Sequence, residues 1–197
     1  MKTSQSVENL LPFDGELYSY GIIFSEEQSK FMLNTLLQSI VWEHDQVRLF
    51  GKTHITARKV AWYGDERRSY RYSGSEKQAH AWTPLLWEIK SKVQEICQAE
   101  YNACLLNLYH DGNEGMGWHA DNEKSIVPKS SIASLSLGSQ RRFDLKHLST
   151  GEKRSLMLEN GHLINMEGVI QDYWKHALPK SKKVNGLRIN LTFRRMI

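Results

Sequence analysis

The sequence has few cysteines and no long apolar run. Cys97 and Cys104 are its only cysteines, so reduced, buried thiols are favoured over a lone disulfide. No apolar run approaches the roughly 18 residues that a membrane-spanning helix needs. The first residues, MKTSQSVENLLPFDGEL, lack the basic and then apolar stretches of a secretory signal. We therefore expect no membrane association and no secretion, which places the protein in the cytoplasm of a bacterium or the nucleus of a eukaryote.

Repeats and low-complexity tracts are also absent, and 197 residues suit one domain spanning residues 1–197. We expect this domain to be a monomer. The composition, 40% apolar and 24% charged, is ordinary for a globular protein. The net charge of +4 weakly favours an anionic partner such as nucleic acid.

Two amphipathic segments predict helices. Residues 25–40 begin with Ser25 and carry Gln28 three positions later, which is a capping box. Residues 83–98 begin with Thr83 as the N-cap and Pro84 at the first helical position. The first twenty or so residues predict an irregular arm.

After residue 101 the sequence consists of short runs in which apolar and polar residues alternate, separated by turns with Gly, Asn and Asp. These runs include ACLLNLY, IASLSLG, RRFDLKH and LRINLTFRR. Strands at this spacing indicate a barrel or a jelly roll. Residues 41–74 are rich in aromatic and β-branched residues and predict further strands and hairpins. The predicted fold class is therefore α+β, with helices and hairpins before an antiparallel β core.

The run LRINLTFRR separates apolar from polar side chains, because successive side chains of a strand point to opposite faces. One face carries Leu187, Ile189, Leu191 and Phe193, and the other carries Arg188, Asn190, Thr192 and Arg194. The polar face belongs either to an edge strand exposed to water or to a strand whose polar side faces a barrel interior. Inside a barrel, two arginines would need an anionic ligand or paired carboxylates. Their spacing suits a small molecule with a carboxylate at each end.

The stretch GMGWHADNEKS contains a candidate metal site. His119 and Asp121 are two residues apart, so on a strand both point to the same side. A second histidine would complete the two-histidine, one-carboxylate triad of Fe(II) oxygenases. The downstream candidates are His147, His162 and His176. The pattern alone does not choose among them, but His176 is favoured because the two-arginine strand follows it closely.

These segments together resemble the AlkB family of iron(II)- and 2-oxoglutarate-dependent dioxygenases. The motifs NLYHDGNEGMGWHADNE, IASLSLGSQRRFDLKH, WKHALPKS and RINLTFR occur in the family's order and cover roughly residues 47–195. The resemblance implies a double-stranded β-helix (jelly-roll) core over about residues 101–197. It also implies a β-hairpin nucleotide-recognition lid over about residues 41–80, after N-terminal helices and an arm over about residues 1–20.

The resemblance also implies the roles of individual residues. The iron ligands would be His119, Asp121 and His176, and the family's R-x-N-x-x-x-R signature falls on Arg188, Asn190 and Arg194. Arg188 would bind the far carboxylate of 2-oxoglutarate, and Arg194 would lie near the carboxylate that chelates iron. Asn107 and Tyr109 match the family's other 2-oxoglutarate contacts. Dioxygen is the second co-substrate.

For the base pocket, the resemblance implies Tyr70, Tyr72 and Ser73 in the lid and Glu123 after the metal motif. Tyr72 would stack on a flipped base with His119 on its other side, and Glu123 would contact the exocyclic amine. The alternatives are a hairpin whose tyrosines only pack and a carboxylate on a solvated turn.

The segment VRLFGKTH resembles a hairpin finger that enters duplex DNA. Leu49, Phe50 and Gly51 would form its apolar tip and fill the gap left by the flipped base. Alternatively, Leu49 and Phe50 belong to the core, and the wedge does not exist.

The implied function is oxidative demethylation of 1-methyladenine and 3-methylcytosine in double- or single-stranded DNA, with release of formaldehyde, succinate and CO2. Two alternatives remain at this stage. The same core can act on RNA or on a protein side chain, or the chain is a non-catalytic nucleic-acid-binding barrel.

Overall fold

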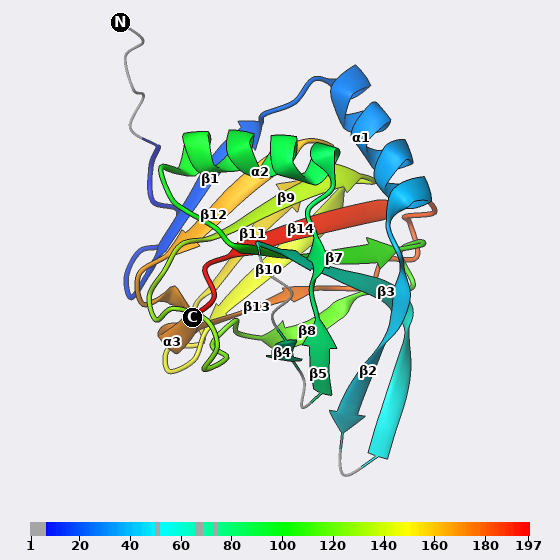
Figure 1. Cartoon of the computed structure of the whole chain (residues 1–197). Coiled ribbons are helices and arrows are strands. Elements are labelled where there is room, and N and C mark those ends of the chain that lie inside the picture. Colours follow the sequence, from blue (N-terminus) through cyan, green and yellow to red (C-terminus); the bar gives the residue numbers. More distant parts are fainter. Residues whose placement is uncertain (1–6, 50–51, 66–68, 73–74) are drawn as a thin grey trace, which may run out of the picture.

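Two antiparallel sheets face each other in the computed structural model, which describes residues 7–49, 52–65, 69–72 and 75–197 (Figure 1). The larger sheet has the order β1-β12-β9-β14-β7-β3-β2, with β6 beside β3. Its strands are β1 (Glu16–Ile22), β12 (His162–Glu167), β9 (Ile132–Gly138), β14 (Arg188–Arg194), β7 (Ala103–Tyr109), β3 (Lys52–Gly64), β2 (Glu43–Leu49) and β6 (His80–Ala81). The smaller sheet contains β11 (Lys153–Leu158), β10 (Arg141–His147), β13 (Trp174–Leu178) and β8 (Met116–His119), in that order.

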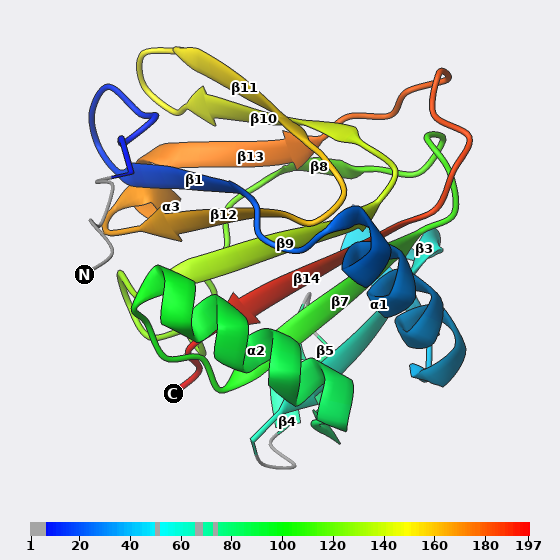
Figure 2. The same ribbon diagram turned by 90° about the horizontal axis from the view of Figure 1, so that it is seen from above.

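Helices cover one face of the larger sheet, and the smaller sheet covers the other (Figure 2). The helices are α1 (Glu26–Ser39) and α2 (Pro84–Cys97), and a short α3 (Ile170–Tyr173) precedes β13. Leu36 of α1 and Ile89 of α2 are fully buried in one cluster with Leu191 of β14. A second cluster, which includes Leu145 and Ile164, lies toward the smaller sheet. The central strands are therefore buried on both faces. No helix among the described residues is long and apolar enough to cross a membrane.

Both helices begin where the sequence predicts. The Ser25 hydroxyl accepts the Gln28 N–H at 3.2 Å, and the Gln28 side chain accepts the Ser25 N–H at 3.0 Å. Thr83 caps α2 by accepting the Leu86 N–H at 3.2 Å. These bonds satisfy amide groups that the first helical turn leaves without partners.

Strand β14 lies in the middle of the larger sheet, hydrogen-bonded to β7 on one side and β9 on the other. All seven of its residues are buried. The edge-strand interpretation of its polar face is therefore wrong, and that face points into the space between the sheets.

The N-terminal segment is more ordered than predicted. Residues 16–22 form β1, which pairs antiparallel with β12, and Leu17 is completely buried. The Asn9 side chain accepts the N–H groups of Leu11 and Leu17 and holds the preceding turn against this strand. The irregular arm over about residues 1–20 is thus wrong for residues 16–20. The register of β1 shifts between Ser19 and Gly21, which interrupts the alternation of its side chains and weakens its sequence signal.

The predicted strands and hairpins between residues 41 and 74 are present. Strands β2 and β3 form a long hairpin at the edge of the larger sheet, and its far end projects beyond the other strands (Figure 1). Strands β4 (Ser69–Tyr72) and β5 (Ser75–Gln78) pair with each other. Phe50, Gly51 and Ser73 lie outside the described residues, and Leu49, Tyr70 and Tyr72 are described as backbone only. The wedge and the aromatic part of the base pocket therefore stay predictions.

Candidate active site

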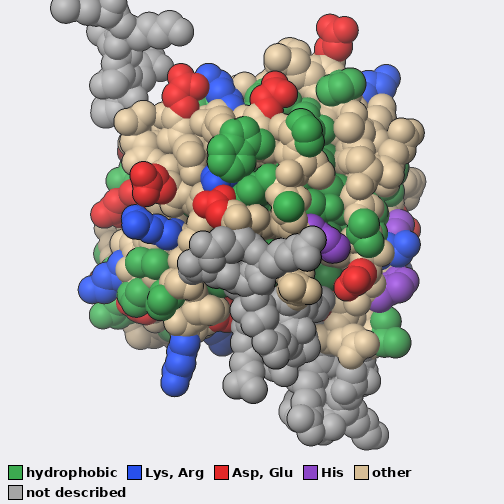
Figure 3. Space-filling view, viewed as in Figure 1, with side chains coloured by type: hydrophobic (Ala, Val, Ile, Leu, Met, Phe, Trp, Pro, Cys, Tyr) green, Lys and Arg blue, Asp and Glu red, His purple; other side chains and the backbone are tan. Residues whose placement is uncertain are grey.

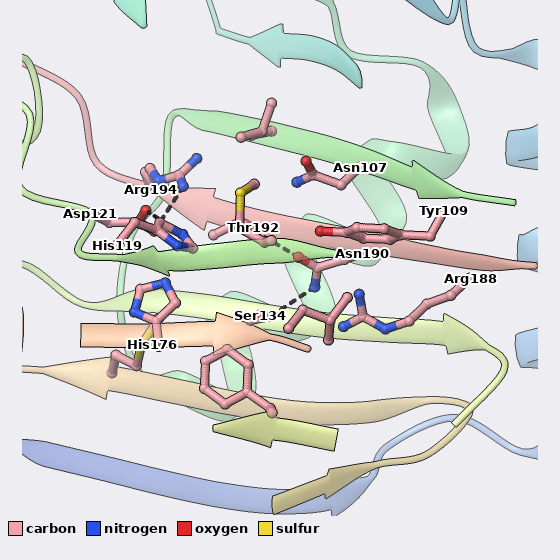
Figure 4. A pocket seen from close by; sticks show the side chains of 15 residues that line it. Asn107, Tyr109, His119, Asp121, Ser134, His176, Arg188, Asn190, Thr192 and Arg194 are labelled. Carbon is pink, nitrogen blue, oxygen red and sulfur yellow. Dashed lines mark hydrogen bonds and ion pairs between the residues drawn. The ribbon is translucent and has the colours of Figure 1, made fainter. Parts of the chain in front are cut away.

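A pocket lies between the two sheets, and strands of both sheets contribute residues that line it (Figure 4). Strand β7 contributes Asn107 and Tyr109, β14 contributes its polar face, and β8 and β13 contribute one histidine each. The eight residues predicted for iron and 2-oxoglutarate all line this pocket: Asn107, Tyr109, His119, Asp121, His176, Arg188, Asn190 and Arg194.

Three of these side chains form a potential metal site. His119 and His176 face each other across the β8–β13 pair, and their ring centroids are 4.2 Å apart. Asp121 lies just beyond β8, and the ligand atoms of all three residues lie within 4.8 Å of one another. His147 and His162 are engaged elsewhere, with Asp14 and Ser19 respectively. The structure thus brings His176, the favoured candidate, to the other two ligands.

The protonation states of the triad suit a divalent cation. The His119 Nδ1 lies 2.8 Å from the Gly117 carbonyl oxygen, so Nδ1 carries the proton and Nε2 is left as an acceptor. Burial lowers the pKa of His176 to about 3, with a further contribution from His119, so this imidazole is neutral. Burial opposes ionisation of Asp121, but the nearby Arg194 and the two histidines outweigh it and lower its pKa to about 2. One carboxylate and two imidazoles are the ligand set of non-haem Fe(II).

The other end of the pocket is built for an anion. Arg188 is only 2% exposed, its guanidinium donates to the Ser136 hydroxyl at 2.8 Å, and no carboxylate among the described residues pairs with it. Burial lowers the pKa of Arg188 to about 10, so it stays charged at neutral pH. A buried charge without a counterion is costly, so this end favours a carboxylate ligand.

Arg194 lies at the metal end. Its Nη2 donates to the Asp121 Oδ2 at 2.8 Å, and its guanidinium lies 5.6 Å from the centroid of the Trp62 ring. The two arginines of β14 therefore stand at opposite ends of one pocket, and Asn190, held by Ser134 at 2.8 Å, lies between them.

Glu123 does not line this pocket. It lies in a neighbouring hollow with Lys124 and Gln171, and Asp121 forms part of the wall of both spaces. Burial raises the pKa of Glu123, and the charge of Arg194 opposes that shift. Its role in reading a base therefore stays a prediction.

Three contributors went unnoticed in the sequence. Ser134 and Ser136 of β9 bond Asn190 and Arg188, and their alternation with apolar residues in IASLSLG was an available signal. Gln171 of α3 accepts the Asp121 N–H at 2.9 Å. No local pattern marks Gln171, because its partner lies 50 residues away.

A two-histidine, one-carboxylate triad between two jelly-roll sheets, with a buried arginine beyond it, defines a non-haem iron oxygenase that takes a carboxylate co-substrate. The family model of the 2OG-Fe(II) oxygenase superfamily matches residues 16–194. The mouse (Mus musculus) protein named DNA oxidative demethylase ALKBH2 is 32% identical over 195 residues, covering 93% of this chain and 82% of that protein. Its human (Homo sapiens) counterpart is 34% identical over 190 residues, covering 91% and 73%. The chain belongs to the AlkB family of 2OG-Fe(II) oxygenases, whose cofactor is Fe(II) and whose co-substrates are 2-oxoglutarate and O2.

A further relative and a solved structure agree with this family assignment. A rat (Rattus norvegicus) protein, alpha-ketoglutarate-dependent dioxygenase alkB homolog 3, is 32% identical over 177 residues, covering 85% of this chain and 60% of that protein. The solved structure of OsALKBH1 matches with a TM-score of 0.65 at 16% identity, covering 96% of this chain and 99% of that one. At this identity the match shows the fold alone, and it confirms the jelly-roll prediction.

Proposed function

We propose that this chain is a DNA repair dioxygenase that removes methyl groups from alkylated bases, with 1-methyladenine and 3-methylcytosine as substrates. The observation that carries the proposal is one pocket that joins an iron-type triad to the buried Arg188, which has no carboxylate partner among the described residues. The relatives named as DNA oxidative demethylases support DNA as the substrate. We propose further that one monomeric domain performs the reaction in the bacterial cytoplasm or the eukaryotic nucleus.

In this proposal, His119, Asp121 and His176 hold Fe(II), and Arg188 binds the far carboxylate of 2-oxoglutarate. Tyr109 and Asn190 orient the same molecule from the two neighbouring strands β7 and β14. Iron and 2-oxoglutarate would, together with O2, supply the oxidation that hydroxylates the methyl group. 2-Oxoglutarate would leave as succinate and CO2, and the hydroxymethyl group would leave the base as formaldehyde. Arg194 keeps the Asp121 carboxylate ionised and oriented, because it donates to its outer oxygen.

The base itself is proposed to bind under the lid. A base within a duplex is inaccessible, so it must be extruded into a pocket. Tyr70, Tyr72 and Ser73 would line that pocket. The Glu123 carboxylate would accept a hydrogen bond from the exocyclic amine of the base. The half-buried position of Glu123 directly beyond the metal-binding residues supports this role.

A row of three lysines supports a polyanionic substrate. Lys146 of β10 lies directly opposite Lys153 of β11 on one side and Lys175 of β13 on the other. All three are exposed on the outer face of the smaller sheet, and no carboxylate among the described residues pairs with them. Like charges placed opposite each other destabilise a sheet, so the row favours a partner that brings negative charge. The face of the molecule shown in Figure 3 carries both acidic and basic side chains, and its coloured side chains form no patch of a single sign.

Asp121→Ala tests the proposal. Purified protein with Fe(II), 2-oxoglutarate and methylated oligonucleotides is assayed by mass for loss of the methyl group, with single-stranded DNA, duplex DNA and RNA in parallel. We expect demethylation by the wild type and at least about a hundredfold loss in the variant, because even partners of metal ligands contribute 10- to 100-fold. Glu88→Ala, which removes an exposed carboxylate on α2 on the opposite side of the larger sheet, is the matched control and keeps activity.

Each alternative predicts a different result. Turnover on RNA alone identifies an RNA demethylase. If the wild type demethylates none of the substrates, and both the wild type and Asp121→Ala bind nucleic acid, the chain is a non-catalytic barrel.

A further inference from the structure

Arg141 is a second buried arginine near the pocket. It begins β10 and is 1% exposed. Its guanidinium donates to three backbone carbonyl oxygens, those of Asp111 at 3.2 Å, Glu114 at 2.7 Å and Pro179 at 2.9 Å. Carbonyl oxygens satisfy its donors but carry no net charge, so the positive charge of Arg141 is not cancelled by these bonds.

The nearest carboxylates are turned to other partners. The two oxygens of Glu114 lie against the ring and the backbone N–H of His110, at 2.9 and 3.0 Å. Asp111 is half-buried, and its carboxylate accepts the backbone and side-chain N–H groups of Asn113. The charges of Asp111 and Glu114 favour the charged form of Arg141 through space, but neither carboxylate bonds to it. No carboxylate within the described ranges forms an ion pair with Arg141.

Arg141 and Arg188 share one neighbour, the ring of Tyr109. The guanidinium carbon of Arg188 lies 5.4 Å from the ring centroid, and that of Arg141 lies 5.8 Å from it. Tyr109 and Arg188 line the pocket, whereas Arg141 does not. The positive charge of Arg141 nevertheless reaches the pocket, since it contributes to lowering the pKa of Arg188. Within a buried environment such charges interact more strongly than in water.

We propose that Arg141 is a positioning residue that raises the affinity of the pocket for a dicarboxylate co-substrate, by adding a second positive charge behind Tyr109. This inference rests on the proposed binding of 2-oxoglutarate at Arg188. The charge of Arg141 acts most strongly on the far carboxylate, because that group would bind at Arg188 beside the shared Tyr109 ring. A 2-oxoacid without that carboxylate gains much less from it.

A purely structural role is the rival explanation. Arg141 links the loop before β8 to the loop after β13, and these loops also bond directly. The Gly112 N–H donates to the Val184 carbonyl at 2.8 Å, and the Ser181 N–H donates to the Gly112 carbonyl at 2.7 Å. A side chain on Gly112 would meet the Ser181 carbonyl oxygen at 1.9 Å, so the loops are in close contact. If Arg141 only joined the loops, its loss would weaken every 2-oxoacid alike.

The test measures binding without turnover. Protein loaded with Mn(II) is titrated calorimetrically with 2-oxoglutarate and with 2-oxobutanoate, which has the same 2-oxoacid group but no far carboxylate. For Arg141→Gln we expect the Kd of 2-oxoglutarate to rise about tenfold, the size of one moderate charge interaction. The Kd of 2-oxobutanoate should change less than about twofold on the same argument. Arg142→Gln makes the same charge change on the exposed side of β10 and should alter neither Kd.

Arg141→Lys keeps the charge but not the planar fork. It should preserve the ratio of the two dissociation constants even if it loosens the loops. If Arg141→Gln does not fold, Arg141→Met also removes the charge and should raise the Kd of 2-oxoglutarate without raising that of 2-oxobutanoate. Equal weakening of both 2-oxoacids, or a changed ratio in Arg141→Lys, overturns the inference. Failure of the wild type to bind 2-oxoglutarate would instead overturn the proposed function.

Discussion

Arg188 has its guanidinium buried at the end of the pocket without a carboxylate partner among the described residues. Replacing it with methionine keeps much of the volume and removes the charge. We expect Arg188→Met to raise the KM for 2-oxoglutarate roughly a hundredfold, since losing one partner of a buried charge pair costs about 2–5 kcal/mol. At saturating 2-oxoglutarate, kcat should change far less.

Succinate release at increasing 2-oxoglutarate concentrations gives both constants. Arg188→Lys should lie between the wild type and Arg188→Met, because an ammonium group cannot form two parallel bonds to a carboxylate. An unchanged KM in Arg188→Met would mean that the co-substrate binds elsewhere.

At the scale of single elements, the prediction to test is that the β2–β3 hairpin inserts a wedge into duplex DNA. Phe50, which follows β2 in the sequence and lies outside the described residues, is proposed to fill the space of the extruded base. Phe50→Ala should lower kcat/KM on methylated duplex DNA several-fold, and single-stranded DNA should be affected much less because it has no such space to fill. Initial rates on both substrates measure this. Leu148→Ala, an exposed leucine between β10 and β11, is the matched control. An equal loss on both substrates would contradict a wedge.

The elements also show which parts of the structure were predictable. Both helix starts and the strands after residue 101 follow from local signals, namely caps and alternation. The alternation of β14 predicted a two-carboxylate site before any family was named, although it left the edge-strand alternative open. Choosing between these required the neighbours of β14, which are β7 and β9 and lie far away in the sequence.

The unpredicted parts depend on contacts between distant segments. Strand β1 is recognisable only beside β12, and Gln171 matters only because α3 packs near the end of β8. The choice of His176 over His147 rests on the β8–β13 pairing. His147 is instead buried near Phe13 and Trp174 and bonded to Asp14. Single-sequence patterns contain no information about which distant strands pair.

For the whole molecule, the lysine row predicts how DNA binding responds to salt. If Lys146 contacts one phosphate, Lys146→Gln should weaken DNA binding and make the slope of log Kd against log salt shallower by about 0.9. Lys30→Gln, an exposed lysine on α1, makes the same charge change on the opposite side of the larger sheet and should leave the slope unchanged. Fluorescence anisotropy with labelled DNA at several salt concentrations provides the slopes. Identical slopes for the wild type and Lys146→Gln would exclude a phosphate contact at this row.

Strand β14 couples folding to chemistry. Its apolar side chains complete the core beneath the helices, and the side chains between them face the pocket. A slip of one residue against β7 and β9 would bury both arginines among leucines and turn the apolar side toward the iron ligands. A misregistered chain would therefore lose its core and its co-substrate site together. The burial that sets the register of β14 therefore also ensures that the active-site side chains are correctly placed. A molecule with β14 displaced would have neither a stable core nor an intact pocket.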